Sequence, residues 1–137
     1  MNFPRFQIAA ESKQFFHMMD APDAMAEFKN EGCGDLYVFF LKVKDNVLTE
    51  IAYFTPGCGF GRATCHLLSE LVVGKTLEEA EKVTPADIEK ALEGYPPKKN
   101  HYPGAVHHTL QLAIANYRSG QKPDPASVTD KIMSAWS

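Results

Sequence analysis

Apolar residues follow a different period in each half of the chain, and the change of period separates a strand region from a helix region. Two runs rich in β-branched and aromatic residues, Leu36–Val43 and Val47–Phe54, predict strands. The Lys-Asp-Asn sequence between them is typical of a tight turn, because Asp and Asn tolerate the left-handed conformation. The two runs therefore predict a β-hairpin. Its first strand is apolar at nearly every position, so we expect both faces of that strand to be covered.

After the hairpin the apolar residues recur with a helical period. The first predicted helix ends near Gly74 and carries an apolar side made of Ala63, Leu67, Leu68, Leu71 and Val72. Capping signals at Thr76–Glu79 and at Thr84, which is followed by Pro85, predict two short helices, the second running to about Gly94. Tyr95–Gly104 contains three prolines and is expected to be a loop. A long amphipathic helix is predicted from Ala105, Val106, Leu110, Ala113, Ile114 and Tyr117.

The two ends of the chain give weaker patterns. Residues 1–31 form a poorly defined N-terminal segment, in which Ser12–Phe28 is interpreted as a helix interrupted at Pro22. Residues 119–137 form a C-terminal extension, with a short helix predicted at about Ser127–Trp136. The length of 137 residues predicts a single domain over 1–137. Because strands precede helices, the expected fold class is α+β, with helices on one face of an antiparallel sheet.

Composition and charge exclude several classes of function. The net charge of −3 and the isoelectric point near 5.9 argue against nucleic acid or an acidic membrane surface as the main partner. No apolar run approaches the roughly 20 residues that span a bilayer. The N-terminus lacks the basic and apolar regions of a secretory signal, so the expected location is the cytoplasm. Thiols stay reduced there, and the three cysteines are better explained as ligands or nucleophiles than as a disulfide framework.

Two of the cysteines are flanked by glycine on both sides. Cys33 lies within Gly-Cys-Gly-Asp and Cys58 within Pro-Gly-Cys-Gly. Thiolates suit zinc, Cu(I) and iron–sulfur clusters, and neighbouring glycines let backbone amides approach the sulfur atoms. Cys58 also precedes a predicted helix, whose positive end should lower its pKa. The plain alternative is that both cysteines are small residues in glycine-rich turns.

The third cysteine and the histidines are judged by their place in the predicted elements. Cys65 lies inside a helix on the side of Leu68, which favours a buried small hydrophobic residue. His101 lies in the loop before the long helix, where a side chain is readily presented to a ligand. Three other histidines are expected on helix surfaces: His66, His107 and His108. The absence of Cys-x-x-Cys argues against a zinc finger, and no phosphate-binding glycine motif supports a nucleotide site.

Several motifs occur together in the order of a known family. They are GCGD at 32–35, PGCG at 56–59, GKTLEEA at 74–80, PPKKNH at 96–101 and AIANY at 113–117. In this combination the chain resembles the U-type iron–sulfur cluster scaffold proteins, which are IscU, SufU and the N-terminal domain of NifU. The resemblance implies a three-stranded antiparallel sheet with helices packed on one face, and hence a strand before Gly32. It also implies a protein that is not an enzyme. Such a protein assembles a 2Fe–2S cluster from iron and from the sulfur of a cysteine desulfurase, then passes it to acceptor proteins.

The resemblance assigns roles to individual residues. Cys33 and Asp35 match the first ligand element, Cys58 the second and His101 the third, and Asp35 would keep the cluster labile. The loop that an Hsp70-type chaperone grips in part of the family corresponds to Pro96, Pro97, Lys98 and Lys99.

One position departs from the family pattern. Tyr102 occupies the place of the third cysteine, directly after the loop histidine, and is expected to cover the site instead of binding metal. Cys65 is then a candidate additional ligand. Three interpretations stay open: a scaffold or carrier of a 2Fe–2S cluster or of iron, a mononuclear zinc site, and a cluster-free module that docks or regulates a cysteine desulfurase. The zinc site would use Cys33, Asp35, Cys58 and His101, an acceptable tetrahedral set.

Overall fold

The fold is built on a three-stranded antiparallel sheet, seen in a computed structural model that describes residues 1–30, 35–56 and 59–126. The strands are β1 (Ala24–Asn30), β2 (Asp35–Lys44) and β3 (Val47–Phe54), in the order β1-β2-β3. The predicted hairpin is confirmed: β2 pairs with β3, with Leu41 opposite Ile51. Asp45 and Asn46 turn the chain with φ values of 51° and 65°, the left-handed conformation expected of them.

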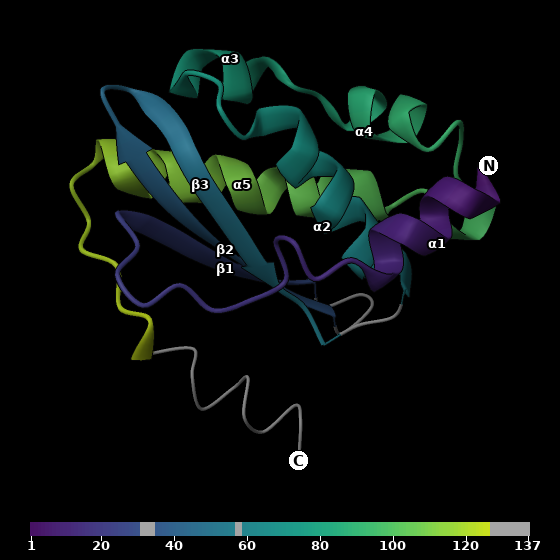
Figure 1. Cartoon of the computed structure of the whole chain (residues 1–137), viewed down its shortest axis with the longest axis horizontal. Helices are drawn as coiled ribbons and strands as arrows, with labels where there is room; N and C mark the ends of the chain where they lie inside the picture. The colour runs from purple at the N-terminus through teal and green to yellow at the C-terminus, as the bar shows by residue number, and fades with distance from the viewer. Residues whose placement is uncertain (31–34, 57–58, 127–137) are drawn as a thin grey trace.

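Helices cover one face of this sheet (Figure 1). Two long helices, α2 (Gly59–Val72) and α5 (Tyr102–Arg118), pack directly on the strands. The shorter elements are α3 (Leu77–Lys82), α4 (Pro85–Ala91) and the 3-10 turn η1 (Pro97–Lys99). Helix α1 (Phe3–Glu11) lies against α2 at one end of the molecule. The predicted α+β class, with helices on one face of an antiparallel sheet, is confirmed.

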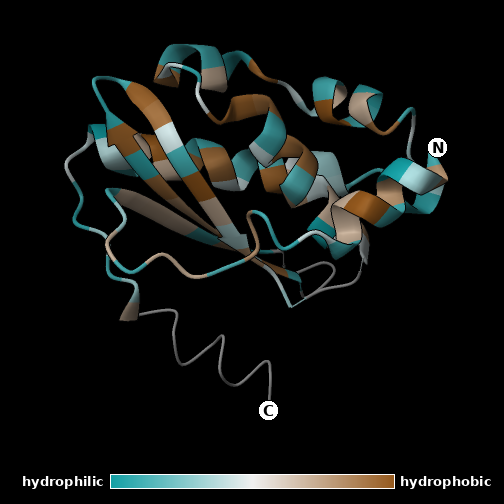
Figure 2. Cartoon of the chain, viewed as in Figure 1, coloured by the Kyte–Doolittle hydropathy of each residue, from teal (hydrophilic) through white to brown (hydrophobic). Residues whose placement is uncertain are grey.

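The main core lies between the sheet and the helices. From the strands, Tyr37, Phe39 and Tyr53 contribute rings that are completely buried. Leu68 of α2 and Leu110 of α5 close the other side. Each large apolar side chain buried in this way contributes about 1.5–3 kcal/mol. Figure 2 shows apolar residues along the strands and on both long helices, with hydrophilic positions concentrated in the turns and short helices.

A second apolar cluster lies on the opposite face of the sheet. Its buried members are Met19, Met25, Val38, Phe40, Ala52 and Phe54. Phe16, from the segment between α1 and β1, packs against this cluster and covers the end of β3. Both faces of β2 are therefore buried, as its almost uniformly apolar sequence predicts.

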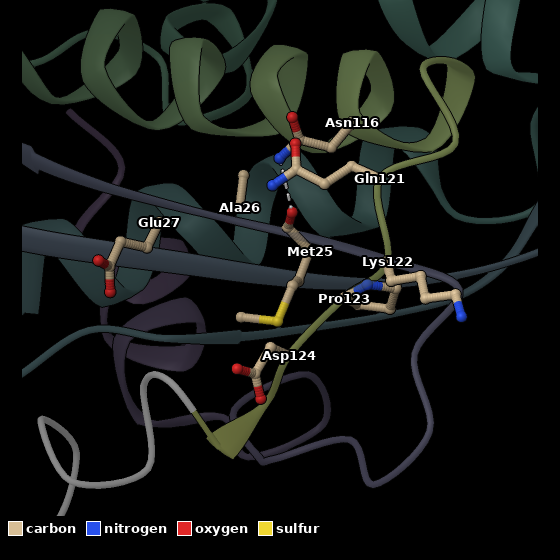
Figure 3. Close-up of a pocket in the computed structure, with 8 residues that line it drawn as sticks. All are labelled: Met25, Ala26, Glu27, Asn116, Gln121, Lys122, Pro123 and Asp124. Atoms are coloured by element: carbon tan, nitrogen blue, oxygen red, sulfur yellow. Dashed lines mark hydrogen bonds between the residues drawn. The ribbon is translucent and has the colours of Figure 1, made fainter.

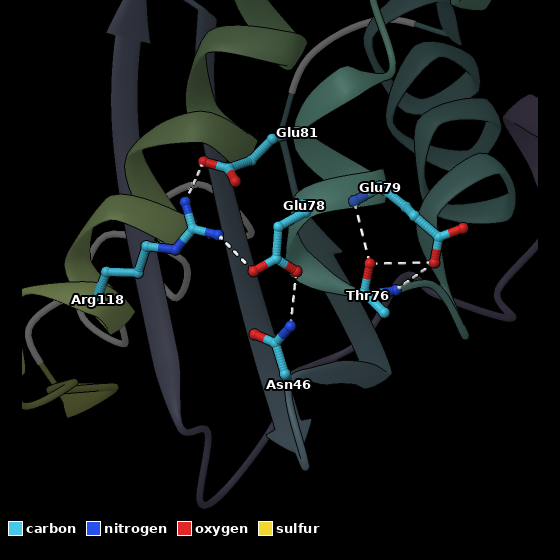
Figure 4. Close-up of polar contacts among 6 residues, drawn as sticks. All are labelled: Asn46, Thr76, Glu78, Glu79, Glu81 and Arg118. Atoms are coloured by element: carbon cyan, nitrogen blue, oxygen red, sulfur yellow. Dashed lines mark hydrogen bonds and ion pairs between the residues drawn. The ribbon is translucent and has the colours of Figure 1, made fainter.

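Local capping signals appear where the sequence predicts them. Thr76 and Glu79 form a capping box at α3, and Thr84 forms another with Asp87 at α4. Figure 4 shows how the first box lies beside a polar connection between three elements. Asn46 donates to Glu78 at 2.6 Å, and Arg118 of α5 pairs with both Glu78 and Glu81. The hairpin turn, α3 and the end of α5 are thereby held together.

The N-terminal prediction was wrong. Ser12–Asp23 contains no helix, and Ala24–Asn30 forms the edge strand β1. Pairing with β2 overrides the apparent helical pattern: Ala24 and Ala26 face the main core, while Met25 between them faces the second cluster. This strand confirms the one that the family resemblance implies before Gly32. Helix α1 was not predicted either; Asn2 caps it by accepting from the Arg5 N–H.

The ends of α5 differ in how well they were predicted. The segment expected to be a loop contains η1, and α5 already begins at Tyr102, with Pro103 in its first turn. Proline is compatible with that position because the first helical N–H groups have no partner within the helix. The helix ends at Arg118, followed by Gly120 with φ of 74°, as predicted. The helix predicted at about 127–136 lies outside the described residues.

The C-terminal segment returns along the edge of the sheet. Asn116 of α5 donates to the Met25 carbonyl at 2.9 Å, which satisfies an acceptor of the edge strand (Figure 3). Gln121 and Lys122 line the adjacent pocket with Asp124. Among the helices of the described ranges, none is both long and apolar enough to cross a bilayer.

Candidate functional site

Four elements meet at one end of the sheet, the end at which β2 begins and β3 finishes. Gly61, in the first turn of α2, is their point of contact. A methyl group added there would lie 3.6 Å from Tyr37 Cε1 and 3.7 Å from both Thr55 Oγ1 and Tyr102 Cε1. These distances are ordinary van der Waals contacts, so the position accepts at most a methyl group. The starts of β2, α2 and α5 are thereby fixed beside the end of β3.

Asp35 is held at this end by a tyrosine of its own strand. The Tyr37 hydroxyl donates to Asp35 Oδ2 at 3.3 Å. Burial, and next the negative charge of Asp35, raise the pKa of Tyr37 well above its usual value. The phenol therefore stays neutral and keeps its proton for the carboxylate. The Tyr37 hydroxyl thus orients the Asp35 carboxylate through Oδ2, and Oδ1 takes no part in this hydrogen bond.

His101 and Tyr102 lie together where α5 begins. His101 directly precedes the helix, and its ring centroid is 4.2 Å from that of Tyr102. Tyr102 is only 5% exposed and stacks on Phe60 of α2, with 6.1 Å between centroids and 23° between planes. The tyrosine therefore packs between α2 and the histidine. Its expected role in covering a metal site stays a prediction.

An aromatic group joins the proline-rich loop to α2. Phe60 contacts Tyr95 and Phe6, and the Lys99 ammonium lies 5.7 Å from its centroid. The Tyr95 and Thr64 hydroxyls are 2.7 Å apart. Burial raises the pKa of Tyr95 to about 12, although the hydrogen bond with Thr64 opposes the rise. The loop predicted to bind a chaperone is therefore anchored at both ends.

The two lysines of that loop differ in their surroundings. Lys98 is exposed, whereas Lys99 is half-buried and turned toward Phe60. Pro97 is exposed and Pro96 is half-buried. Nothing in these positions tests binding to a chaperone, which stays a prediction.

The two glycine-flanked cysteines, Cys33 and Cys58, lie outside the described residues. Their neighbours in sequence do not: Asp35 begins β2 and Gly59 begins α2. Within residues 1–30, 35–56 and 59–126, no group of three or more His, Cys, Asp or Glu side chains could hold a metal. The predicted metal site therefore stays a prediction.

Cys65 belongs to the core. Its side chain is completely buried in the main core, among residues of the sheet and of α2. Burial raises the pKa of its thiol well above the usual value, so the group stays protonated at neutral pH. These surroundings favour a packing role over a role as an additional ligand.

The expectation for His66 was wrong. It is only 4% exposed, not on the helix surface. Its ring lies 5.3 Å from that of Phe15, and Nε2 is 3.2 Å from Glu70, which also contacts Arg5 of α1 at 3.5 Å. The reason is α1 and the segment after it, which cover this side of α2. Two other histidines were expected on helix surfaces. His108 is exposed and its ring contacts Phe28, whereas His107 is half-buried.

Sequence reasoning also missed the residues that pack the site. Phe60, Gly61 and Tyr95 form the contacts described above, and no chemical motif marks them. The Gly-Phe-Gly sequence at the predicted helix start was the available signal, since glycine inside a helix costs stability and its small size lets other elements pack close to the helix.

Comparison with known proteins places the chain in a family. The model of the NifU-like N-terminal domain family matches residues 9–124. The iron–sulfur cluster assembly scaffold protein IscU of Aquifex aeolicus is 30% identical over 117 residues, 82% of this chain and 74% of that protein. The scaffold protein IscU 1 of Archaeoglobus fulgidus is 38% identical over 95 residues. That alignment spans 69% of this chain but only 62% of the length of the Archaeoglobus protein.

Solved structures show the same fold at lower sequence identity. A putative iron–sulfur cluster assembly scaffold protein for the SUF system from Fervidobacterium islandicum superposes with a TM-score of 0.68 at 17% identity, covering 80% of this chain and 93% of that one. The N-terminal part of a NifU-like protein from Brucella abortus gives 0.53 at 21% identity, covering 96% and 90%. Because the family model matches most of this chain, the chain belongs to the NifU-like N-terminal domain family of iron–sulfur cluster assembly scaffolds.

Proposed function

We propose that this protein is a scaffold or carrier that receives iron and sulfur, holds them as a 2Fe–2S cluster and passes the cluster to acceptor proteins. The cluster is cargo and not a catalytic group, so the protein is not an enzyme. The observation that carries the proposal is the meeting of four elements at Gly61. This contact brings the residues that adjoin both glycine-flanked cysteines to the same end of the sheet as His101.

The proposed ligands are Cys33, Asp35, Cys58 and His101. Thiolates suit iron–sulfur clusters, and imidazole can replace thiolate on one iron of a 2Fe–2S centre. Asp35 would supply a carboxylate oxygen, a harder and more easily exchanged ligand than sulfur. The Tyr37 hydroxyl on Oδ2 withdraws charge from this carboxylate and so favours a labile bond to iron. Lability is useful in a protein that must release its cargo.

Tyr102 would close the site without binding metal. An unperturbed phenol has a pKa near 10, so at neutral pH it is a poor ligand compared with a thiolate. Its ring already packs on Phe60 and beside His101. We therefore assign it to covering the cluster, which is held by one thiolate fewer than the family pattern provides.

The proposed partners follow from the same function. A cysteine desulfurase would supply sulfur, and apo proteins would accept the finished cluster in the cytoplasm. An Hsp70-type chaperone would grip the segment from Pro96 to Lys99. In that segment Lys98 is free to be contacted at the surface, whereas Lys99 lies over Phe60.

Reconstitution without oxygen tests the proposed ligands. Cys33→Ser and Cys58→Ser should each abolish the visible absorbance of the cluster, whereas Cys65→Ala should retain most of it. Cys65→Ala is the matched control, because it removes a thiol of the same chain that is buried in the core and away from solvent. Loss of the cluster in Cys65→Ala, with its melting temperature close to that of the parent, would show that this residue is a ligand.

The same experiment separates the other two interpretations. A colourless protein with one zinc per chain, lost in Cys33→Ser, would establish the mononuclear zinc site instead. A metal-free protein that binds a cysteine desulfurase would establish the docking module. Either result would overturn the proposal.

A further inference from the structure

The first turns of α2 carry a positive charge where a helix ordinarily favours a negative one. Arg62 is the fourth residue of α2, and the first turn contains no acidic residue. A cation near a helix N-terminus opposes the helix dipole, so this placement is locally unfavourable.

Aromatic side chains fix the position of this arginine. Its Cζ atom lies 4.1 Å from the ring centroid of Phe16. Phe16 is itself held against β3, since its backbone bridges to Tyr53 and its ring packs edge-on against the Tyr53 ring at 5.4 Å. The guanidinium is therefore placed at the end of β3, beside the start of α2, and the arginine is half-buried there.

Two donors in this place are buried without a close hydrogen-bond partner in the described part of the chain. The Nε atom of Arg62 and the hydroxyl of Tyr53 are both buried and have no hydrogen-bond partner among the described residues. Tyr53 is completely buried. Burial raises the pKa of Tyr53, whereas the charge of Arg62 and the approach of its N–H groups to the hydroxyl oxygen oppose that rise. The two groups therefore lie near each other, and the hydroxyl keeps its own hydrogen to donate. A buried polar group left in this way destabilises the fold unless something else accepts its hydrogen.

Among the described residues, no carboxylate lies within ion-pair distance of Arg62. In the ion pairs found among residues 1–30, 35–56 and 59–126, the arginines that contact a carboxylate are Arg5 and Arg118. Arg62 takes part in none of these pairs. A cation, two unsatisfied donors and the positive end of α2 thus lie together. Such a combination favours an anion.

We infer that Arg62, with Tyr53 behind it, is a positioning residue that holds the negative charge of the cluster at the start of α2. The inference rests on the proposed function. Two thiolates and one carboxylate bring more negative charge than a core of two ferric ions and two sulfides can neutralise, so the loaded site is anionic. The guanidinium offers this anion both a compensating charge and hydrogen bonds to sulfur, and the neutral Tyr53 hydroxyl adds a donor.

A purely structural role for Arg62 predicts a different outcome for the metal-free protein. If the arginine serves only to hold Phe16 in place, its replacement should weaken the fold and the cluster site together. If it is kept for the cargo, an apolar replacement should remove a costly buried donor from the metal-free protein. Arg62→Met makes this distinction, because a methionine can still pack on the Phe16 ring.

The test compares Arg62→Met and Arg62→Lys with the parent and with Lys44→Gln. Lys44 is exposed at the far end of β2, so Lys44→Gln removes one positive charge away from the site. We expect Arg62→Met to match or exceed the parent in metal-free melting temperature, and to hold a reconstituted cluster for about a tenfold shorter time, the equivalent of one lost hydrogen bond to a charged group. Its reduction potential should also be lower, because a nearby cation favours the more negative reduced cluster. Arg62→Lys should restore most of the potential.

Two results would overturn the inference. One is a cluster lifetime and reduction potential in Arg62→Met equal to those of Lys44→Gln. The other is a fall in metal-free melting temperature that accounts for the shorter lifetime, with no change in potential. Both leave the proposed function intact if the parent holds its cluster. If the parent holds no cluster, the proposed function and this inference fail together.

Discussion

Tyr102 offers the sharpest test of how the site differs from the family pattern. Tyr102→Cys should lower the stability of the metal-free protein while lengthening the lifetime of a reconstituted cluster. The ring is 5% exposed and packs on Phe60 and against Gly61, so its removal leaves a cavity between α2 and α5. Truncating a buried aromatic residue to alanine costs about 3–5 kcal/mol, and the sulfur atom recovers part of this, which leaves about 2–4 kcal/mol.

That loss is large enough to measure. For a chain of this size, 1 kcal/mol corresponds to roughly 3–5 °C in melting temperature, so calorimetry of metal-free Tyr102→Cys should show a fall of about 10 °C. The cluster should nevertheless persist longer, because a third thiolate, a soft ligand suited to iron–sulfur clusters, replaces a phenol. Cluster lifetime is followed by visible absorbance under anaerobic conditions.

Tyr102→Phe is the matched control. It retains the ring that packs on Phe60 and removes only the hydroxyl, so we expect a loss of stability near 1 kcal/mol and an unchanged cluster lifetime. The reasoning is refuted if Tyr102→Phe loses the cluster while Tyr102→Cys does not prolong it. The tyrosine hydroxyl would then be part of the site itself.

Three further predictions concern the fold. Burial lowers the pKa of His66 below its usual value, although Glu70 opposes this. As the pH falls, the unfolded chain therefore binds a proton at this histidine before the folded chain does. The contribution of His66 to the free energy of unfolding should be complete above about pH 6.5 and should be lost as the pH drops below that value. Denaturant titrations in which His66→Gln kept the same pH dependence would contradict this. Thr76→Ala should lose about 1 kcal/mol by calorimetry, because it removes the side-chain cap of α3, and no change would mean that the capping box adds nothing. Gly61→Ala should be tolerated or stabilise the protein by up to about 1 kcal/mol, since a methyl group meets only ordinary contacts there; a marked loss would show that α2 lies closer to Tyr37 than the structure indicates.

The features predicted correctly from sequence are those that local interactions determine. The turn at Asp45 and Asn46 depends on two residues that tolerate the left-handed conformation, and the structure has both there. The capping boxes at Thr76 and Thr84 need only residues three positions apart. Such signals survive without knowledge of tertiary contacts, which is why the hairpin and the short helices were placed well.

The errors occur where distant segments decide the outcome. His66 has the sequence context of a surface residue, and only the packing of α1 and of the segment after it buries this side chain. Strand β1 exists because β2 pairs with it, whereas its own residues resemble an interrupted helix. The same limit applies to the site. Glycine-flanked thiols can be recognised locally, but the unsatisfied Arg62 and Tyr53 become visible only when residues from three segments are seen together.

The central claim, that this chain carries an iron–sulfur cluster as cargo, is tested most directly by the metal and sulfide content of the protein purified without oxygen. Iron, zinc and acid-labile sulfide should be measured per chain on the same sample. The account predicts a coloured protein with iron and sulfide in equal amounts and little zinc, and loss of both iron and sulfide in Cys58→Ser. Zinc at one ion per chain with no labile sulfide, before and after reconstitution with iron and sulfide, would contradict it.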